Sequence, residues 1–271
     1  MVVPPRVSRS LSEKLFDPTL EQVLEFCARD PIERVFLEDV ARRGLGRFLA
    51  VDGGDGRLVS LCHLGANLVP SGVGCGVFAE AAAGTLSKMI IGDERAVGEL
   101  WRAAEPRMPN PRADRPGQPV YAIADPPGPG ASGLRTATLD DLEQLIPVCA
   151  AAHEHELGVD PLARDPEGFR WRTRAQIVDA RSWIWVDGGV ILFKAEASAW
   201  TPAAVQIQQV WVDPQVRGRG YGARGMRDLC RLLLAQTPFV TLFVRTENAA
   251  AIALYESIGM RLVGRYRSLL F

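Results

Sequence analysis

The segment with the clearest chemical capacity is QVRGRGYG, residues 215–222, which holds three glycines and two arginines. It lies between a strand-like run at 204–212 and a stretch with helical periodicity. Backbone N–H groups at a helix start lack partners, and the helix dipole adds positive potential there. Glycines would let that backbone approach a ligand closely, and Arg217 and Arg219 would add charge-assisted contacts. These residues predict a phosphate or pyrophosphate site, with a tight surface turn and solvated arginines as the equally weighted alternative.

Two other kinds of phosphate-binding loop do not fit this spacing. A Walker A loop needs Gly-Lys followed by Ser or Thr, and the stretch contains no lysine. A Rossmann fingerprint needs GxGxxG, whereas Gly218, Gly220 and Gly222 form GxGxG. A dinucleotide site would also need an acidic residue near the end of the next strand, where only the late Glu247 is available.

The glycine loop resembles the cofactor loop of the GNAT acyltransferase superfamily. Gln215, Gly218 and Gly220 match the Q/R-x-x-G-x-G/A pattern of that family in full. The preceding VWVDP, residues 210–214, is similar to the strand and Asp-Pro that lead into the family's loop. The resemblance implies that the loop binds the pyrophosphate of coenzyme A, and that acetyl-CoA or another acyl-CoA is the co-substrate, without a metal.

A second segment resembles the same family. NAAAIALYESIGM, residues 248–260, is similar to the signature N-x-x-A-x-x-L-Y-x-x-x-G-F, with Met260 in place of Phe. The two motifs occur in the family's order, about thirty residues apart, and the resemblance covers residues 134–271. It implies an acyl-CoA-dependent N-acyltransferase, which would transfer an acetyl group from acetyl-CoA to a primary amine by direct attack.

The resemblance also implies a role for individual residues. The strand over 205–212 would pair with the pantetheine arm, where this family splays two parallel strands apart. Asn248 would hydrogen-bond that arm, with a simple helix N-cap as the alternative. Tyr255 would be the general acid for the departing thiolate, with a core tyrosine as the alternative. The implied cofactor-binding residues are Val210, Trp211, Val212, Gln215, Val216, Arg217, Gly218, Arg219, Gly220, Tyr221, Gly222, Ala223, Asn248 and Tyr255.

A general base is harder to identify. Many relatives carry a glutamate on the strand before the loop, but here VQIQQVWV, residues 205–212, has only glutamines, which can orient a water without accepting its proton. The remaining candidates lie just past the first predicted helix and on the hairpin: His153, Glu154, His155, Glu156 and Glu196. For each of them a solvated or structural role is the stronger alternative. Because the strand carries only glutamines, we predict that no single carboxylate is indispensable. A three-histidine metal site would require His63 from the other half, and we predict none.

Regular elements that would position these residues can be followed along 134–271. Apolar periodicity and turn residues predict an alternation of strands and helices. The predicted elements are a strand at 134–136, a helix capped by Thr138, a helix beginning at Asp165-Pro166, a hairpin over 183–197, a strand at 204–212, a helix through 226–233, a central strand at 239–244, a helix at 248–257 ended by Gly259, and a closing strand at 261–271.

The N-terminal half echoes this pattern. FLAVDGGDGRLVSLCHL, residues 48–64, repeats the strand, Asp-Gly-Gly, strand order of 183–197. ANLVPSGVGCG, residues 66–76, keeps the GxGxG spacing but has no equivalent of Gln215 or of the two arginines. We therefore expect an α/β (α+β) protein with tandem GNAT-like domains, each a mixed central sheet flanked by helices.

The second signature has a faded counterpart as well. MIIG, residues 89–92, stands where the central strand would be, and ERAVGELWRA, residues 94–103, follows it. Leu100 and Trp101 occupy the places of Leu254 and Tyr255, and tryptophan cannot act as an acid. The N-terminal half is therefore predicted to have lost catalysis and coenzyme A binding, as in two-domain bacterial GNAT proteins that the layout resembles.

Proline and glycine mark the predicted division between the halves. DPPGPGASG, residues 125–133, reads as a linker, and the proline-rich segment at 105–119 precedes it. The predicted organisation is a degenerate GNAT-like domain at 1–125, a linker at 126–133 and a catalytic GNAT domain at 134–271.

Composition limits the remaining possibilities. The formal net charge of −1 argues against a nucleic-acid partner, even though the loop is arginine-rich. Five scattered cysteines without a CxxC pair fit reduced thiols, and MVVPPRVSRS lacks a signal-peptide core. We therefore expect a cytoplasmic protein without a membrane partner, as a monomer or homodimer. The acceptor would be a small-molecule amine or a protein lysine or N-terminus, and the alternative function is a non-catalytic CoA or acyl-CoA sensor.

Overall fold

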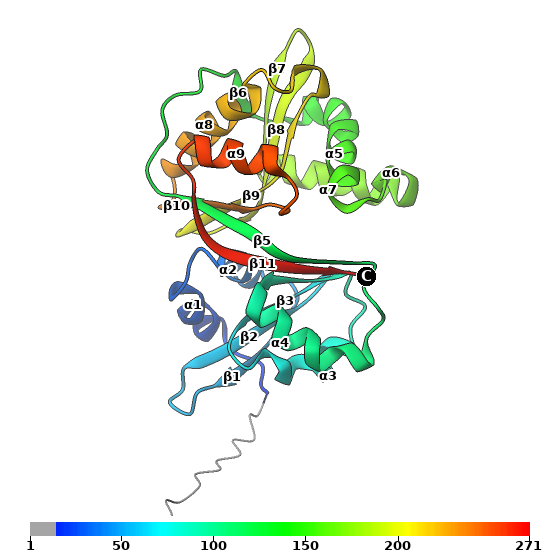
Figure 1. Cartoon of the computed structure of the whole chain (residues 1–271), viewed down its shortest axis with the longest axis vertical. Coiled ribbons are helices and arrows are strands. Elements are labelled where there is room, and N and C mark those ends of the chain that lie inside the picture. Colours follow the sequence, from blue (N-terminus) through cyan, green and yellow to red (C-terminus); the bar gives the residue numbers. More distant parts are fainter. Residues whose placement is uncertain (1–14) are drawn as a thin grey trace, which may run out of the picture.

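A single twisted sheet of eleven strands runs through the whole molecule (Figure 1). The computed structural model describes residues 15–271, so the signal-peptide prediction for MVVPPRVSRS lies outside the described residues. The strand order is β1-β2-β3-β4-β11-β5-β10-β9-β8-β7-β6. Their bounds are β1 (Arg47–Asp52), β2 (Leu58–Leu64), β3 (Asn67–Gly72), β4 (Met89–Asp93), β5 (Ala113–Ile123), β6 (Leu134–Thr136), β7 (Ser182–Asp187), β8 (Val190–Trp200), β9 (Ala204–Val212), β10 (Phe239–Phe243) and β11 (Arg261–Leu270).

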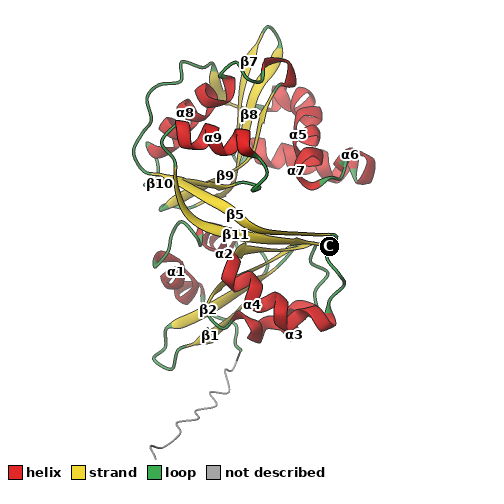
Figure 2. Ribbon diagram, in the orientation of Figure 1, coloured by secondary structure: helices red, strands yellow, loops and turns green. Residues whose placement is uncertain are grey.

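Helices cover both faces of the sheet in each half (Figure 2). They are α1 (Leu20–Ala28), α2 (Val35–Arg42), α3 (Ala79–Ala83), α4 (Glu94–Ala104), α5 (Leu142–Leu157), α6 (Pro161–Arg164), α7 (Pro166–Val178), α8 (Tyr221–Leu234) and α9 (Ala249–Ser257). Alternation along β7 shows the two faces: Trp183 and Trp185 pack with α8 and α9, whereas Ile184 packs with α5 and α7. On β1, Leu49 packs with α3 and α4, whereas its neighbour Ala50 packs with α1 and α2 on the opposite face.

The two halves repeat one topology, which confirms the tandem fold expected from the sequence. In the N-terminal half β1, β2 and β3 are antiparallel, and β3 pairs in parallel with β4. In the C-terminal half β7, β8 and β9 are antiparallel, and β9 pairs in parallel with β10. The elements predicted for 134–271 are all present, with the short helix α6 in addition.

The halves are joined because each contributes a strand to the other. β5, from the N-terminal half, pairs with β10 on one side and with β11 on the other. β11, the last strand of the chain, pairs with β4 of the N-terminal half. Figure 1 shows β5 and β11 running side by side between the halves. This exchange leaves neither half with an exposed sheet edge at their junction.

β5 is a central strand that the sequence analysis did not predict, because its first residues belong to the proline-rich segment at 105–119. The register against β11 shifts between the pairs Tyr266–Gln118 and Ser268–Arg115. Between these pairs β5 has one residue more than β11. The extra residue forms a bulge in β5, in the segment that contains Pro116. Proline is tolerated in sheets at bulges of this kind because no ladder hydrogen bond is required of it there.

The segment predicted as a linker is tied to α8. Asp228 on α8 accepts hydrogen bonds from the backbone N–H groups of Gly130 and Ser132, both at 2.7 Å. A Cβ atom at Gly130 would lie 1.9 Å from the carbonyl oxygen of Arg224, so only glycine fits this approach. The connection is therefore packed along the C-terminal half.

A buried ion pair joins α2 of the N-terminal half to the C-terminal half. Asp39, only 2% exposed, accepts from both terminal nitrogens of Arg181 at 3.1 and 2.7 Å, and from the backbone N–H of Trp200 at 3.2 Å. Beside it, Val35 packs against Ala199 and Ala204. Among residues 15–271, no helix is both long and apolar enough to cross a membrane.

Candidate active site

The central feature of the site is a separation between two parallel strands. β9 and β10 pair only from Ala204–Phe239 to Gln206–Thr241, although β9 continues to Val212. The register of β9 against β8 shifts twice, and Gln209 adopts a positive φ of +50°. Such bulges bend a strand away from its neighbour. The edge of β9 that faces β10 is therefore left unpaired beyond Gln206.

The glycine loop lies directly beyond this open edge. Gly220 is the N-cap residue of α8 in the left-handed conformation (φ +82°), and no side chain caps the helix. Gly218 also has a positive φ of +72°, and neither glycine has an atom within 4 Å of an added Cβ. The first turn of α8 therefore has no side-chain cap, and the glycines before it leave room for a ligand to approach, which is an arrangement that suits an anion.

The predicted cofactor residues around this loop divide into exposed and packed ones. Gln215 and the segment 217–220 are exposed. Arg217 donates from Nε to the carbonyl of Val212 at 3.1 Å, which turns its guanidinium back toward the strand. Gly222 is buried where α8 meets α9, and an added Cβ would lie 2.7 Å from Leu254 Cδ1. The remaining residues pack partly against the core: Val210, Trp211, Val212, Val216, Tyr221 and Ala223.

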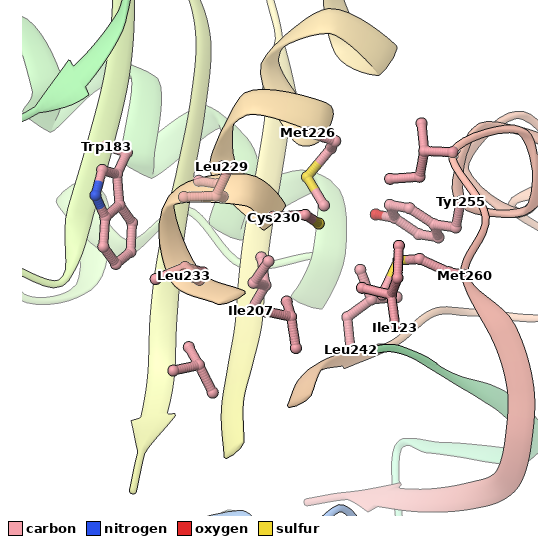
Figure 3. Packing of buried hydrophobic residues seen from close by; sticks show 14 of the residues in the cluster. Ile123, Trp183, Ile207, Met226, Leu229, Cys230, Leu233, Leu242, Tyr255 and Met260 are labelled. Atoms are coloured by element: carbon pink, nitrogen blue, oxygen red, sulfur yellow. The ribbon is translucent and has the colours of Figure 1, made fainter. Parts of the chain in front are cut away.

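Tyr255 on α9 points across to Met226 and Cys230 of α8 (Figure 3). Its side chain is only 6% exposed, and its ring centroid lies 6.3 Å from that of Tyr121. Burial and, secondarily, the Glu156 carboxylate raise its pKa, so the phenol holds its proton at neutral pH. Asn248 caps α9 by accepting from the N–H of Ala251 at 3.2 Å, as the N-cap alternative requires.

The candidate bases at 153–156 lie inside α5, so their placement just past the first helix was wrong. Glu154 and His155 are exposed, whereas His153 is half-buried with its ring 5.9 Å from that of Phe169. Burial lowers the pKa of His153. Glu156 is half-buried, and burial raises its pKa despite the opposing fields of Arg115, Lys194 and Arg245.

Glu196 is held in a buried polar cluster. Lys194 Nζ donates to Glu196 at 2.6 Å, to Cys149 Sγ at 3.1 Å and to Gln209 Oε1 at 3.0 Å. Burial lowers the pKa of Lys194, but the neighbouring Glu196 and Cys149 together raise it by more, so the net shift is upward. The Glu196 carboxylate is therefore engaged by a buried lysine and lies in the core, away from solvent. The sequence analysis missed Lys194, although a lysine within the apolar run ILFKAEA was a signal for it.

The N-terminal half fills the equivalent of the anion site with its own side chain. Gly74 has the left-handed conformation of Gly220, with φ +74°. The N–H group of the next residue, Cys75, donates to the carboxylate of Glu99 on α4 at 2.9 Å. A cavity of about 470 Å³ beside this loop is lined by Gly74, Gly76, Glu99, Arg102 and Ala103. Within the described part of the chain, no three His, Cys, Asp or Glu side chains are grouped to hold a metal ion.

Comparison with known proteins agrees with this geometry. Residues 148–260 match the model of the acetyltransferase (GNAT) family, and residues 46–145 match a domain of unknown function, DUF4081. Relatives include the N-alpha-acetyltransferase RimI of Mycobacterium tuberculosis, 44% identical over 24% of this chain and 40% of its own length. A mycothiol acetyltransferase of a Mycobacterium species (strain MCS) is 32% identical over 49% of this chain and 48% of its own length. The chain thus spans less than half of either relative.

Solved structures share the fold over nearly the whole chain. A GNAT-family acetyltransferase from Colwellia psychrerythraea has a TM-score of 0.59 and 12% identity, over 95% of this chain and 99% of its own. A tandem GNAT protein from the clavulanic acid biosynthesis pathway has a TM-score of 0.56 and 13% identity, over 95% of this chain and 98% of its own. At these identities the similarity concerns the fold. Residues 148–260 therefore form a domain that matches the GNAT acetyltransferase family.

Proposed function

We propose that this protein transfers an acetyl group from acetyl-CoA to a primary amine by direct attack. The observation that carries the proposal is the open edge of β9 leading to the uncapped start of α8. The glycine loop would bind the pyrophosphate, and the edge of β9 would pair with the pantetheine arm. When bound, acetyl-CoA supplies an activated acyl group on a thiolate leaving group.

Two side chains would move the protons of this reaction. Glu156 would accept a proton from the ammonium group of the acceptor, because its raised pKa makes it a stronger base than an exposed glutamate. The neutral amine would then attack the thioester carbon. As the C–N bond forms and the C–S bond breaks, Tyr255 would donate its proton to the departing sulfur. The second proton lost by the nitrogen would return to the Tyr255 oxygen, which leaves the amide and free coenzyme A thiol.

The names of the relatives bear on the class of acceptor. One relative is named an N-alpha-acetyltransferase and others are named mycothiol acetyltransferases, so a protein N-terminus or lysine and a small-molecule amine are both candidates. Five buried free cysteines support a reducing, cytoplasmic location. We propose a monomer or a homodimer as the working form.

A thiol-release assay would test the proposal. The purified chain is incubated with acetyl-CoA and a panel of amines, amino acids and peptides, and free thiol and acetylated product are measured. We expect release that depends on an acceptor. Calorimetric binding of acetyl-CoA without release for any acceptor would instead support the alternative of a non-catalytic CoA sensor, which the glutamine-only strand motivates.

A further inference from the structure

Two contacts bring the two halves together around the end of α5. Arg112, just before β5, donates from Nη1 to the carbonyl of Leu157 at 3.0 Å, one residue beyond Glu156. On the other side, the N–H of Val244, after β10, donates to the carbonyl of Pro119 on β5 at 3.1 Å. The N-terminal half therefore reaches both the helix that carries the candidate base and the loop that leads to α9.

Arg115 lies on β5 between these contacts. Its partner in the sheet is Ser268 on β11, and Arg115 is half-buried. The next residue after Val244 is Arg245, whose side chain is 23% exposed. Burial, and next the charge of Arg245, lower the pKa of Arg115, while Glu247 and, less strongly, Glu156 act in the opposite direction. A Cβ atom at Gly117, two residues along β5 from Arg115, would lie 3.9 Å from Thr246 Cγ2, beside Arg245. With the Arg112–Leu157 contact, this packing places Arg115 between Arg245 and the end of α5 that carries Glu156.

This region has more positive than negative charge. Within residues 15–271, no carboxylate lies within 4 Å of Arg115. Arg245 has only Glu247, at 3.7 Å, and that side chain is 64% exposed. Arg115 therefore loses hydration without a close counter-ion, and Arg245 has only an exposed one, so a bound anion would offset that cost. Glu156 would not serve as the counter-ion, since a base must be free to take a proton.

We infer that the acceptor is a primary amine that also carries a carboxylate, which Arg115 and Arg245 bind while Glu156 faces the amine. This inference rests on the proposed function and names its substrate class. Guanidinium groups suit a carboxylate because they present parallel donors in a fixed plane. Arg115 comes from β5, so the acceptor site is incomplete without the N-terminal half, although that half has lost its own anion site.

Matched acceptors test the inference directly. Thiol release is measured with glycine and glycinamide, β-alanine and β-alaninamide, and γ-aminobutyrate and its amide, each pair differing in the carboxylate. O-phosphoethanolamine and ethanolamine form a further pair that detects a preference for phosphate. We expect kcat/KM to be about 10- to 100-fold higher for the acid in at least one carboxylate pair, as a charge-assisted contact provides. Equal rates within every carboxylate pair, or a preference for the phosphate pair alone, would overturn it.

Variants identify the residues responsible. Arg115→Gln should lower kcat/KM for the preferred acid by about 10- to 100-fold, leave its amide within about threefold, and leave KM for acetyl-CoA unchanged. Arg115→Lys should retain part of the preference, and Arg57→Gln, in the exposed β1–β2 turn, controls for the change of net charge. An equal loss for acid and amide would assign Arg115 a structural role and refute the inference. Turnover without any acid preference would refute the inference alone, whereas no turnover with any amine would refute the proposed function too.

Discussion

Burial perturbs the pKa of both Tyr255 and Glu156, the two side chains proposed to move protons. Burial and the nearby carboxylate keep the phenol protonated, as a general acid must be. Burial also raises the pKa of Glu156, which brings it closer to the working pH of a general base. Both shifts follow mainly from removal of these groups from water.

Tyr255→Phe should separate chemistry from binding. The ring and its packing on α8 remain, so acetyl-CoA affinity should stay within about threefold, measured by calorimetry. Loss of the hydroxyl should lower kcat by about a hundredfold, the low end for acid catalysis, because a thiolate is already a fair leaving group. Turnover at the parental rate would make Tyr255 a core residue only.

Glu156→Gln should remove the base while preserving the helix. We expect kcat/KM to fall by about 10²- to 10³-fold, with Glu154→Gln, an exposed neighbour on α5, as the matched control. In the parent, the acidic limb of kcat/KM should lie above the ordinary glutamate pKa and should be lost in the variant. Equal, small effects of both substitutions would restore the idea that water carries the proton away without a dedicated carboxylate.

The same substitution has a consequence for stability. A folded-state pKa above the unfolded one means that stability is lost as pH rises through the folded value. Glutamine is never ionised, so Glu156→Gln should be at least as stable as the parent at pH 8. Thermal unfolding at pH 5 and pH 8 measures this, and a variant less stable than the parent at pH 8 would contradict the assigned direction.

At the scale of elements, the loop between β9 and α8 depends on backbone N–H groups and glycine geometry. Gly220→Asp should abolish measurable coenzyme A binding, because it adds a negative charge where the pyrophosphate would lie. Gly220→Asn is the matched control, since it has the same size and the same left-handed backbone demand without the charge. Calorimetry of both variants decides the matter: unchanged affinity in the aspartate variant would remove the loop from the binding site.

The corresponding loop of the N-terminal half should bind no coenzyme A. Its N–H group at Cys75 already donates to Glu99, and it lacks a cationic partner equivalent to Arg217 or Arg219. Titration should give one coenzyme A per chain, and Gly74→Asp should leave affinity unchanged while Gly220→Asp abolishes it. Two sites per chain, with one lost in Gly74→Asp, would show that the first half still binds the cofactor.

At the scale of the molecule, exchange of β5 and β11 makes the halves one sheet, and the Asp39–Arg181 pair joins them beside it. Asp39→Asn should lower the free energy of unfolding by about 3–5 kcal/mol, because Arg181 keeps its charge in a buried position without a partner. Asp17→Asn, which breaks the exposed pair with Arg47, serves as the control and should leave urea unfolding unchanged within error. Equal effects of the two substitutions would mean that the buried Asp39–Arg181 pair stabilises the protein no more than the exposed Asp17–Arg47 pair does.

Local signals in the sequence were sufficient for much of this protein. Apolar periodicity, the Asp-Gly-Gly turns and the glycine loop depend on residues close together along the chain, so they predicted the elements of 134–271 and the repeated topology of the first half. The predicted domain boundary near residue 130 stays a prediction. Strand pairing crosses that boundary, because β5 pairs with β10 and β11 pairs with β4.

Tertiary structure decided what depends on distant partners. Glu154, Glu156 and Glu196 look alike in sequence, but one is exposed, one is half-buried near Tyr255 and one is paired with Lys194. Strand exchange likewise hid β5 in a proline-rich segment, because its partners lie more than a hundred residues away in β10 and β11. Burial and contacts between distant residues determine the pKa values and the neighbours of charged groups. Short-range sequence patterns contain no information about either.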